Sequence, residues 1–132
     1  MNMKNMINNF LIINCIGKDD KLGLRINKDF FIHNISKKKN YNGTLISEIM
    51  NFLNSHEVKL NKDFSVIVNQ GPGSFSGVRI SLAVAKGLEI SKNVRLFGFK
   101  NSDLVKFNQE NVEKLLSRNL IEKKLIKAIY LS

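Results

Sequence analysis

The chain has 132 residues, enough for one domain with a buried core, and a second folded domain would need residues that it does not have. Hydrophobic residues make up 43% of it, but no apolar run approaches the roughly 18 residues of a membrane span, so we expect no membrane-spanning segment. The net charge of +10 would favour binding to a polyanion such as nucleic acid. Of the 21 basic residues, however, four are arginines and 17 are lysines scattered along the chain, a pattern typical of compositional bias.

The first residues of the chain are unlike an export signal. Met1 to Asn9 are too polar for a secretory leader, and Cys15, the only cysteine, cannot form an intramolecular disulfide. We therefore expect a cytoplasmic protein in which Cys15 is a small buried hydrophobe. The one dense basic run, Lys37 to Lys39, falls in an expected loop, where a solvated turn is a plainer interpretation than an RNA contact.

Three short strands are expected first, at 10–16, 22–26 and 30–35. Each is apolar or alternates apolar with polar residues, and turn-forming residues separate them. Because the connections are short, the three strands should form an antiparallel meander. The sequence therefore predicts that the fold begins with a sheet.

A helix over 45–53 is expected next, with Asn42 or Thr44 as its N-cap. Its apolar residues form one stripe at helical spacing and a second stripe beside it: Leu45, Ile49, Phe52 and Leu53, then Ile46 and Met50. So wide an apolar face means either that the helix is deeply buried or that a partner covers it.

The rest of the chain predicts a strand at 64–68, a glycine-rich loop, a helix over 78–90 and a strand at 94–99. The two strands should be parallel and joined by a right-handed crossover. The complete pattern is an α/β fold, a mixed five-stranded sheet with flanking helices. We expect one lobe over 1–132 with its core at 10–100, followed by a C-terminal helix and a short terminal strand within 109–132.

The glycine-rich loop between strand and helix suggests a phosphate cradle, because free N–H groups at a helix N-terminus favour an anion. Its motif residues are Gly71, Pro72, Gly73, Ser74, Phe75, Ser76, Gly77 and Arg79. The spacing excludes a Walker loop, since Val78 and Arg79 follow Gly77 where Lys and Ser or Thr are needed. It also excludes the dinucleotide fingerprint and the Gly-x-Ser-x-Gly nucleophile elbow.

The helix over 78–90 is apolar nearly all round. Small residues alternate with larger ones along it: Ser81, Ala83, Ala85 and Gly87 among Val78, Ile80, Leu82, Val84, Leu88 and Ile90. One sheet cannot cover every face of such a helix, so a second helix should pack over the small residues. That helix is either the one over 45–53 or one from another protein, and both can be true.

No catalytic constellation is evident elsewhere. His33 and His56 stand alone and are interpreted as a strand side chain and an exposed helix-end residue. Asp19, Asp20 and Asp103 fall in turns or at a cap, where Asp is expected for its backbone hydrogen bonds. We predict no metal, no cofactor and no enzymatic activity for this chain.

The loop and the helix after it carry a resemblance. The run Gly71-Pro72-Gly73-Ser74-Phe75-Ser76-Gly77-Val78-Arg79-Ile80, followed by Ala83 and Ala85-Lys86-Gly87-Leu88, resembles the signature of the bacterial TsaB (YeaZ) family. The similarity covers about residues 10–99. It implies the actin-like, Hsp70-like ATPase fold, which is ribonuclease H-like, with this chain forming the N-terminal lobe and lacking most of the C-terminal one.

The resemblance also implies a role. TsaB proteins support threonylcarbamoyl modification of the tRNA adenosine beside the anticodon without being the catalyst. They bind a TsaD subunit as a heterodimer, a TsaE ATPase joins the pair, and they often form homodimers alone; tRNA would be reached indirectly, through the complex. The expected partner-binding residues are Ile46, Met50, Phe52, Leu53, Val78, Ser81, Leu82, Ala83, Ala85, Lys86 and Ile90.

Two features bear on that resemblance. Family members usually have Asp-Thr-Ser/Ala at the end of the first strand, whereas this chain has Asn14-Cys15-Ile16, which makes metal-dependent nucleotide chemistry a poorer interpretation. The ending Ala128 to Ser132 resembles the family's terminal Pro-x-Tyr-Leu-Arg stretch. The alternatives are a small basic RNA-binding protein and, more remotely, a degenerate ATPase or peptidase of the same fold.

Overall fold

The computed structural model describes residues 7–35, 44–123 and 126–130. Its centre is a five-stranded sheet in the order β3-β2-β1-β4-β5. The strands are β1 (Phe10–Asn14), β2 (Lys21–Ile26), β3 (Asp29–Asn34), β4 (Ser65–Asn69) and β5 (Arg95–Phe99). β1, β2 and β3 are antiparallel neighbours, while β4 pairs in parallel with both β1 and β5. The expected meander and parallel pair are thus confirmed.

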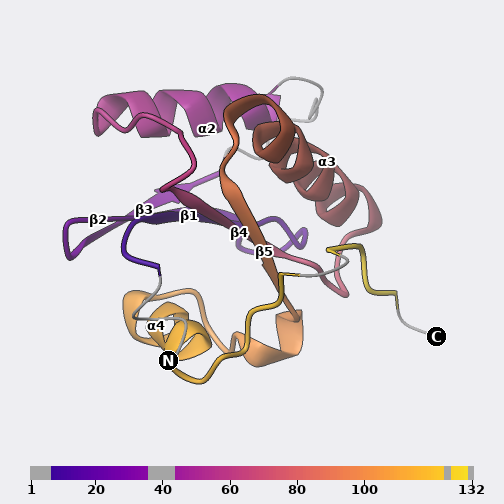
Figure 1. The fold of residues 1–132 in the computed structure, drawn as a ribbon. Coiled ribbons are helices and arrows are strands. Elements are labelled where there is room, and N and C mark those ends of the chain that lie inside the picture. Colours follow the sequence, from indigo (N-terminus) through magenta and orange to yellow (C-terminus); the bar gives the residue numbers. More distant parts are fainter. Residues whose placement is uncertain (1–6, 36–43, 124–125, 131–132) are drawn as a thin grey trace.

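Helices cover both faces of this sheet (Figure 1). α2 (Thr44–Ser55) and α3 (Phe75–Lys92) lie side by side on one face, and α4 (Gln109–Ser117) lies on the other, after a short 3-10 turn, η1 (Asn101–Asp103). α3 begins three residues before the expected start, because the hydroxyl oxygen of Ser74 accepts the N–H of Gly77 (3.3 Å) and caps the helix there. No helix of the described residues is long and apolar enough to cross a membrane.

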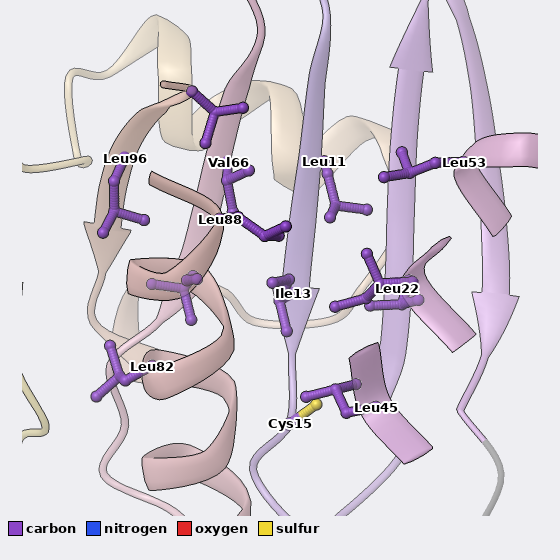
Figure 2. Close-up of a cluster of buried hydrophobic side chains, with 14 of the residues drawn as sticks. Leu11, Ile13, Cys15, Leu22, Leu45, Leu53, Val66, Leu82, Leu88 and Leu96 are labelled. Atoms are coloured by element: carbon purple, nitrogen blue, oxygen red, sulfur yellow. The ribbon is translucent and has the colours of Figure 1, made fainter. Parts of the chain in front are cut away.

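Alternation along the strands divides the core between the two faces. Leu11 and Ile13 point into the cluster under α2 and α3, whereas Phe10 and Ile12 belong to the cluster under α4. Figure 2 shows part of the first cluster, with Cys15 buried among leucines from the strands and from both helices. The sheet is therefore buried on both sides, as its nearly continuous apolar strands β1 and β4 predict.

The end of the chain departs from expectation. The short terminal strand is absent from residues 126–130; instead, the N–H of Ile129 donates to the Gln70 carbonyl (2.8 Å), and Gln70 Nε2 donates to the Lys127 carbonyl (2.9 Å). These bonds hold the terminal segment against the glycine loop. Two further predictions, the Lys37 to Lys39 loop and an Asn42 cap, lie outside the described residues.

Candidate functional site

The glycine loop packs against the chain that leaves β1. The N–H of Ser74 donates to the carbonyl of Ile16 (2.7 Å), and the N–H of Asn101 donates to the carbonyl of Gly71 (2.9 Å). Gly71 has φ +90°, a conformation that residues with a Cβ rarely adopt, and a cis peptide bond joins it to Pro72. The loop is thus held on both sides by backbone hydrogen bonds.

Close approach explains two further glycines of the loop. A Cβ on Gly73 would lie 2.7 Å from Ile16 Cβ, and a Cβ on Gly77 would lie 2.9 Å from the carbonyl oxygen of Cys15. Both distances are shorter than carbon and oxygen atoms tolerate. The space that glycines open for a phosphate in other loops is taken here by the side chain of Ile16 and the backbone of Cys15.

An amide cluster lies at the carboxyl ends of β1 and β4. Asn69 Nδ2 donates to Asn14 Oδ1 (2.7 Å) and to Asn101 Oδ1 (3.0 Å), and Asn69 Oδ1 accepts the N–H of Gly71 (2.8 Å). These hydrogen bonds join three uncharged amides. The described residues contain no group of three His, Cys, Asp or Glu side chains placed to hold a metal ion.

The residues that could carry acid, base or nucleophile chemistry are engaged in structure. Ser74 caps α3, and Asp20 Oδ1 accepts the N–H groups of Ile16 and Gly17 (3.0 and 2.8 Å), as expected for a turn. His33 Nε2 lies 3.3 Å from Glu48 Oε1. The expectation that His56 is exposed is wrong, because its half-buried ring stacks on Phe31 at 4.1 Å between ring centroids and also contacts Phe52.

Cys15 is a core residue, as expected, and is 2% exposed. Burial of the thiol, and to a smaller extent the negative charges of Asp20 and Glu48, raises the pKa of Cys15 far above its ordinary value. A thiol that stays protonated is a poor nucleophile. Cys15 therefore contributes packing to the core and no reactive group to a site.

The residues expected to bind a partner fall into three groups. Six are buried within the chain itself: Phe52, Leu53, Val78, Ser81, Leu82 and Ala85. Ile46 and Met50 are half-buried against the same core, and Ala83, Lys86 and Ile90 are exposed. A partner could therefore reach only the last two groups. Gly87 joins them on the outer side of α3, where a Cβ would meet nothing within 4 Å.

A second surface feature could not be found from spacing in the sequence. Phe75 and Tyr130 are exposed, and their ring centroids lie 6.0 Å apart. The guanidinium carbon of Arg79 lies 4.9 Å from the Phe75 centroid, and Arg79 Nη1 donates to the Tyr130 hydroxyl (3.0 Å). Only the docking of the terminal segment beside α3 brings Tyr130 to the other two residues.

Comparison with known proteins identifies the fold and the family. A family model described as "TsaD: tRNA N6-adenosine threonylcarbamoyltransferase" matches residues 34–127. The chain is also 42% identical over 64 residues to the tRNA threonylcarbamoyladenosine biosynthesis protein TsaB of Buchnera aphidicola subsp. Baizongia pistaciae (strain Bp). The chain belongs to the family that this model describes, and its resemblance to TsaB (YeaZ) proteins is confirmed. The match covers 47% of this chain and 29% of that relative.

Solved structures agree on the fold. YeaZ from Pseudomonas aeruginosa superposes with a TM-score of 0.61 at 21% identity, covering 74% of this chain and 45% of that one. A second structure is described as an uncharacterized protein with similarity to peptidase YEAZ from Pseudomonas aeruginosa. It superposes with a TM-score of 0.66 at 18% identity, covering 75% of this chain and 46% of that one. The actin-like fold with a mixed five-stranded sheet is thus confirmed, and the chain spans less than half the length of each of these relatives.

Proposed function

We propose that this TsaB-family chain is an accessory, non-catalytic subunit in threonylcarbamoyl modification of tRNA. In this proposal it pairs with a TsaD-like subunit, a TsaE-like ATPase joins the pair, and tRNA is reached through the complex in the cytoplasm. The name of the Buchnera relative supports the pathway, because that protein is a tRNA threonylcarbamoyladenosine biosynthesis protein.

The observation that carries the proposal is the outer side of α3. We define the docking strip as Ile80, Ala83, Val84, Gly87 and Ile90, which follow one another at intervals of three and four residues. Ile90 is 81% exposed, and Gly87 leaves open space above the helix. Small residues let a partner helix approach closely, and the larger ones on either side supply apolar area.

α2 extends this surface. It packs beside α3 on the same face of the sheet, and Ile46 and Met50 on it remain partly accessible. A two-helix surface suits a partner that contributes helices of its own. A stable pair of this kind buries on the order of 1,600 Å² in total, which one isolated helix could not supply.

The accessory role is supported by the glycine loop. Its space is filled by the side chain of Ile16 and the backbone of Cys15, Ser74 is used as a helix cap, and Asn69 donates to the amide oxygens of Asn14 and Asn101. An ATPase or a peptidase of this fold would need charged or nucleophilic groups in these positions. Binding, rather than chemistry, is what the surface of this chain offers.

The test is co-purification with the TsaD-like subunit of the same organism. Ala83→Glu places a charge in the centre of the docking strip and should abolish the pairing, while the exposed position leaves the fold intact. Gln109→Glu adds the same charge to the exposed first turn of α4 and is the matched control.

Retained pairing of Ala83→Glu, with circular dichroism equal to that of the unchanged chain, would reject the docking strip. Mass measurement of the chain alone extends the test, because an uncovered apolar strip favours a homodimer. The same substitution should then convert that homodimer to a monomer. If it does so but leaves the TsaD-like subunit bound, the strip is a homodimer surface only.

A further inference from the structure

We infer that the edge of α3 beside the terminal segment binds a single-stranded RNA directly. Bases would stack on Phe75 and Tyr130, and phosphates would contact Lys86 and Lys127. This goes beyond the proposed function, in which tRNA is reached through the partner complex. We call this edge the RNA edge and define it by the exposed side chains of Phe75, Tyr130, Lys86 and Lys127, which would all contact the RNA.

The aromatic end of the RNA edge is built for stacking. Phe75 and Tyr130 are 64% and 58% exposed, so two large rings are left in water although the terminal segment is already docked. Beside them is a hollow of about 180 Å³, lined by Pro72, Gly73, Phe75, Val78, Ala128, Ile129 and Tyr130. A water molecule occupies about 30 Å³, so the hollow could hold several waters. That is enough room for one planar base.

Arg79 adds to the aromatic end in two ways. Its guanidinium lies over the Phe75 ring and its Nη1 donates to Tyr130, so the two rings are held in a defined arrangement before any ligand arrives. An arginine plane next to exposed aromatic rings is a common arrangement where proteins stack unpaired bases. Its charge also favours the phosphate that accompanies each base.

The other end of the RNA edge is basic. Lys86, Lys123 and Lys127 line one hollow of about 310 Å³ together with Glu89, Leu96 and Ile126. Among these residues Glu89 carries the one negative charge. Within the described part of the chain, none of the three ammonium groups has a carboxylate within 4.0 Å. A phosphate can bind these ammonium groups without breaking an ion pair within the protein, so the binding free energy is not reduced by such a loss.

The two ends form one continuous surface. Phe75 and Lys86 are eleven residues apart on α3, which is three turns plus about 20°, so they share one edge about 16 Å long. Tyr130 contacts Phe75, and Lys127 lines the same hollow as Lys86, so the terminal segment runs antiparallel beside that edge. At about 3.4 Å per stacked nucleotide, this length matches about five nucleotides.

Most of the docking strip lies elsewhere on the helix. Gly87, Ile80 and Val84 are about 120°, 140° and 180° further round α3 than Phe75, whereas Ile90 and Ala83 are only about 60° and 80° away. Figure 1 shows α2 and the terminal segment on opposite flanks of α3. The docking strip therefore borders the RNA edge without coinciding with it. An acidic protein is a poorer occupant of the RNA edge, because carboxylates make no use of the aromatic end.

The test measures fluorescence anisotropy of a labelled single-stranded RNA oligonucleotide with the isolated chain over a series of salt concentrations. Phe75→Ala should weaken binding about tenfold, the size expected for one lost base stack. Phe75→Leu keeps an apolar side chain without a flat ring and should weaken binding to a similar extent. Val105→Ala removes another exposed apolar side chain and should change nothing.

The lysines are tested by a pair of double variants. Lys86→Glu with Lys127→Glu should lower the slope of log affinity against log salt by about 1.4, because each phosphate contact on a single strand contributes about 0.7. Lys59→Glu with Lys62→Glu changes the net charge equally at exposed positions before β4, and is the matched control. It should leave the slope nearly unchanged.

Three results would overturn the inference. An equal decrease of the salt slope in both lysine double variants would mean that the net charge alone attracts RNA. Unchanged RNA affinity in both Phe75 variants would mean that no base stacks on Phe75. Displacement of the RNA by an equal concentration of an oligoglutamate peptide would mean that the site takes an acidic protein instead. Because no partner subunit is present, these outcomes are independent of the pairing test.

Discussion

The helices α3 and α4 cover opposite faces of the sheet, and their outer sides differ. α4 buries Val112, Leu115 and Leu116 and turns a polar side outward, with Glu113 forming an ion pair with Arg25 of β2. α3 buries six residues and still leaves Ala83 and Ile90 in water. Both helices close a core, but only one of them carries more apolar surface than that task requires.

This difference separates stability from binding. A helix whose apolar stripe matches the width of the core has no further area to offer. A helix that remains apolar on the outside loses solubility without gaining stability in the isolated chain, so its outer residues need another reason. Changes under α4 should therefore affect folding alone, while changes on the outside of α3 should affect association.

Leu115→Ala should give the largest effect on stability. The side chain is fully buried under the sheet, and its truncation should lower the free energy of unfolding by about 2–5 kcal/mol. Urea denaturation followed by circular dichroism measures it. Gln109→Ala, on the exposed side of the same helix, should stay within about 0.5 kcal/mol. If folded Leu115→Ala no longer paired with the TsaD-like subunit, changes under α4 would affect association as well as folding, contrary to this comparison.

Cys15 tests the core under α2 and α3 through pH. Because the pKa of its thiol is raised in the folded chain, the unfolded chain loses that proton first, at about pH 8.5. Between about pH 8.5 and 9.5 the free energy of unfolding should fall by up to about 1.4 kcal/mol per pH unit. Cys15→Ala should remove this slope. A slope that persists in the variant would have to come from other groups.

Gly87→Ala should have the smallest effect, and of opposite sign. A Cβ there meets open space, and alanine suits a helix interior better, so the free energy of unfolding should rise by about 0.5–1 kcal/mol. Thermal unfolding measures the gain. A substantial loss instead would mean that the outer side of α3 is covered within the isolated chain.

Much of the fold could be predicted from the sequence because its signals are local. Alternation of apolar residues identifies the strands, and helical spacing identifies α2 and most of α3. The sequence predicts the start of α3 three residues too late, because Phe75, Ser76 and Gly77 do not follow the apolar period and the capping role of Ser74 shows only in its hydrogen bond. Residues 126–130 do not form the expected terminal strand, because an apolar run indicates that a segment packs but not whether a strand is available to pair with it.

The candidate site could be predicted only in part. Helical spacing shows that α3 is apolar nearly all round, but it does not show which side faces the sheet. It therefore groups buried residues such as Leu82 and Ala85 with exposed ones such as Ile90. The contact of Tyr130 with Phe75 and Arg79 has no signal in spacing, since 51 residues separate Arg79 from Tyr130.

The sequence by itself determined the order and type of most elements, the place of the glycine loop and the family signature, because each depends on residues close together in the chain. The tertiary structure alone decided which apolar residues are sheltered, what fills the glycine loop and which aromatic and basic side chains share an edge. Those are properties of contacts between segments far apart in sequence, and only the packing of one element against another sets them.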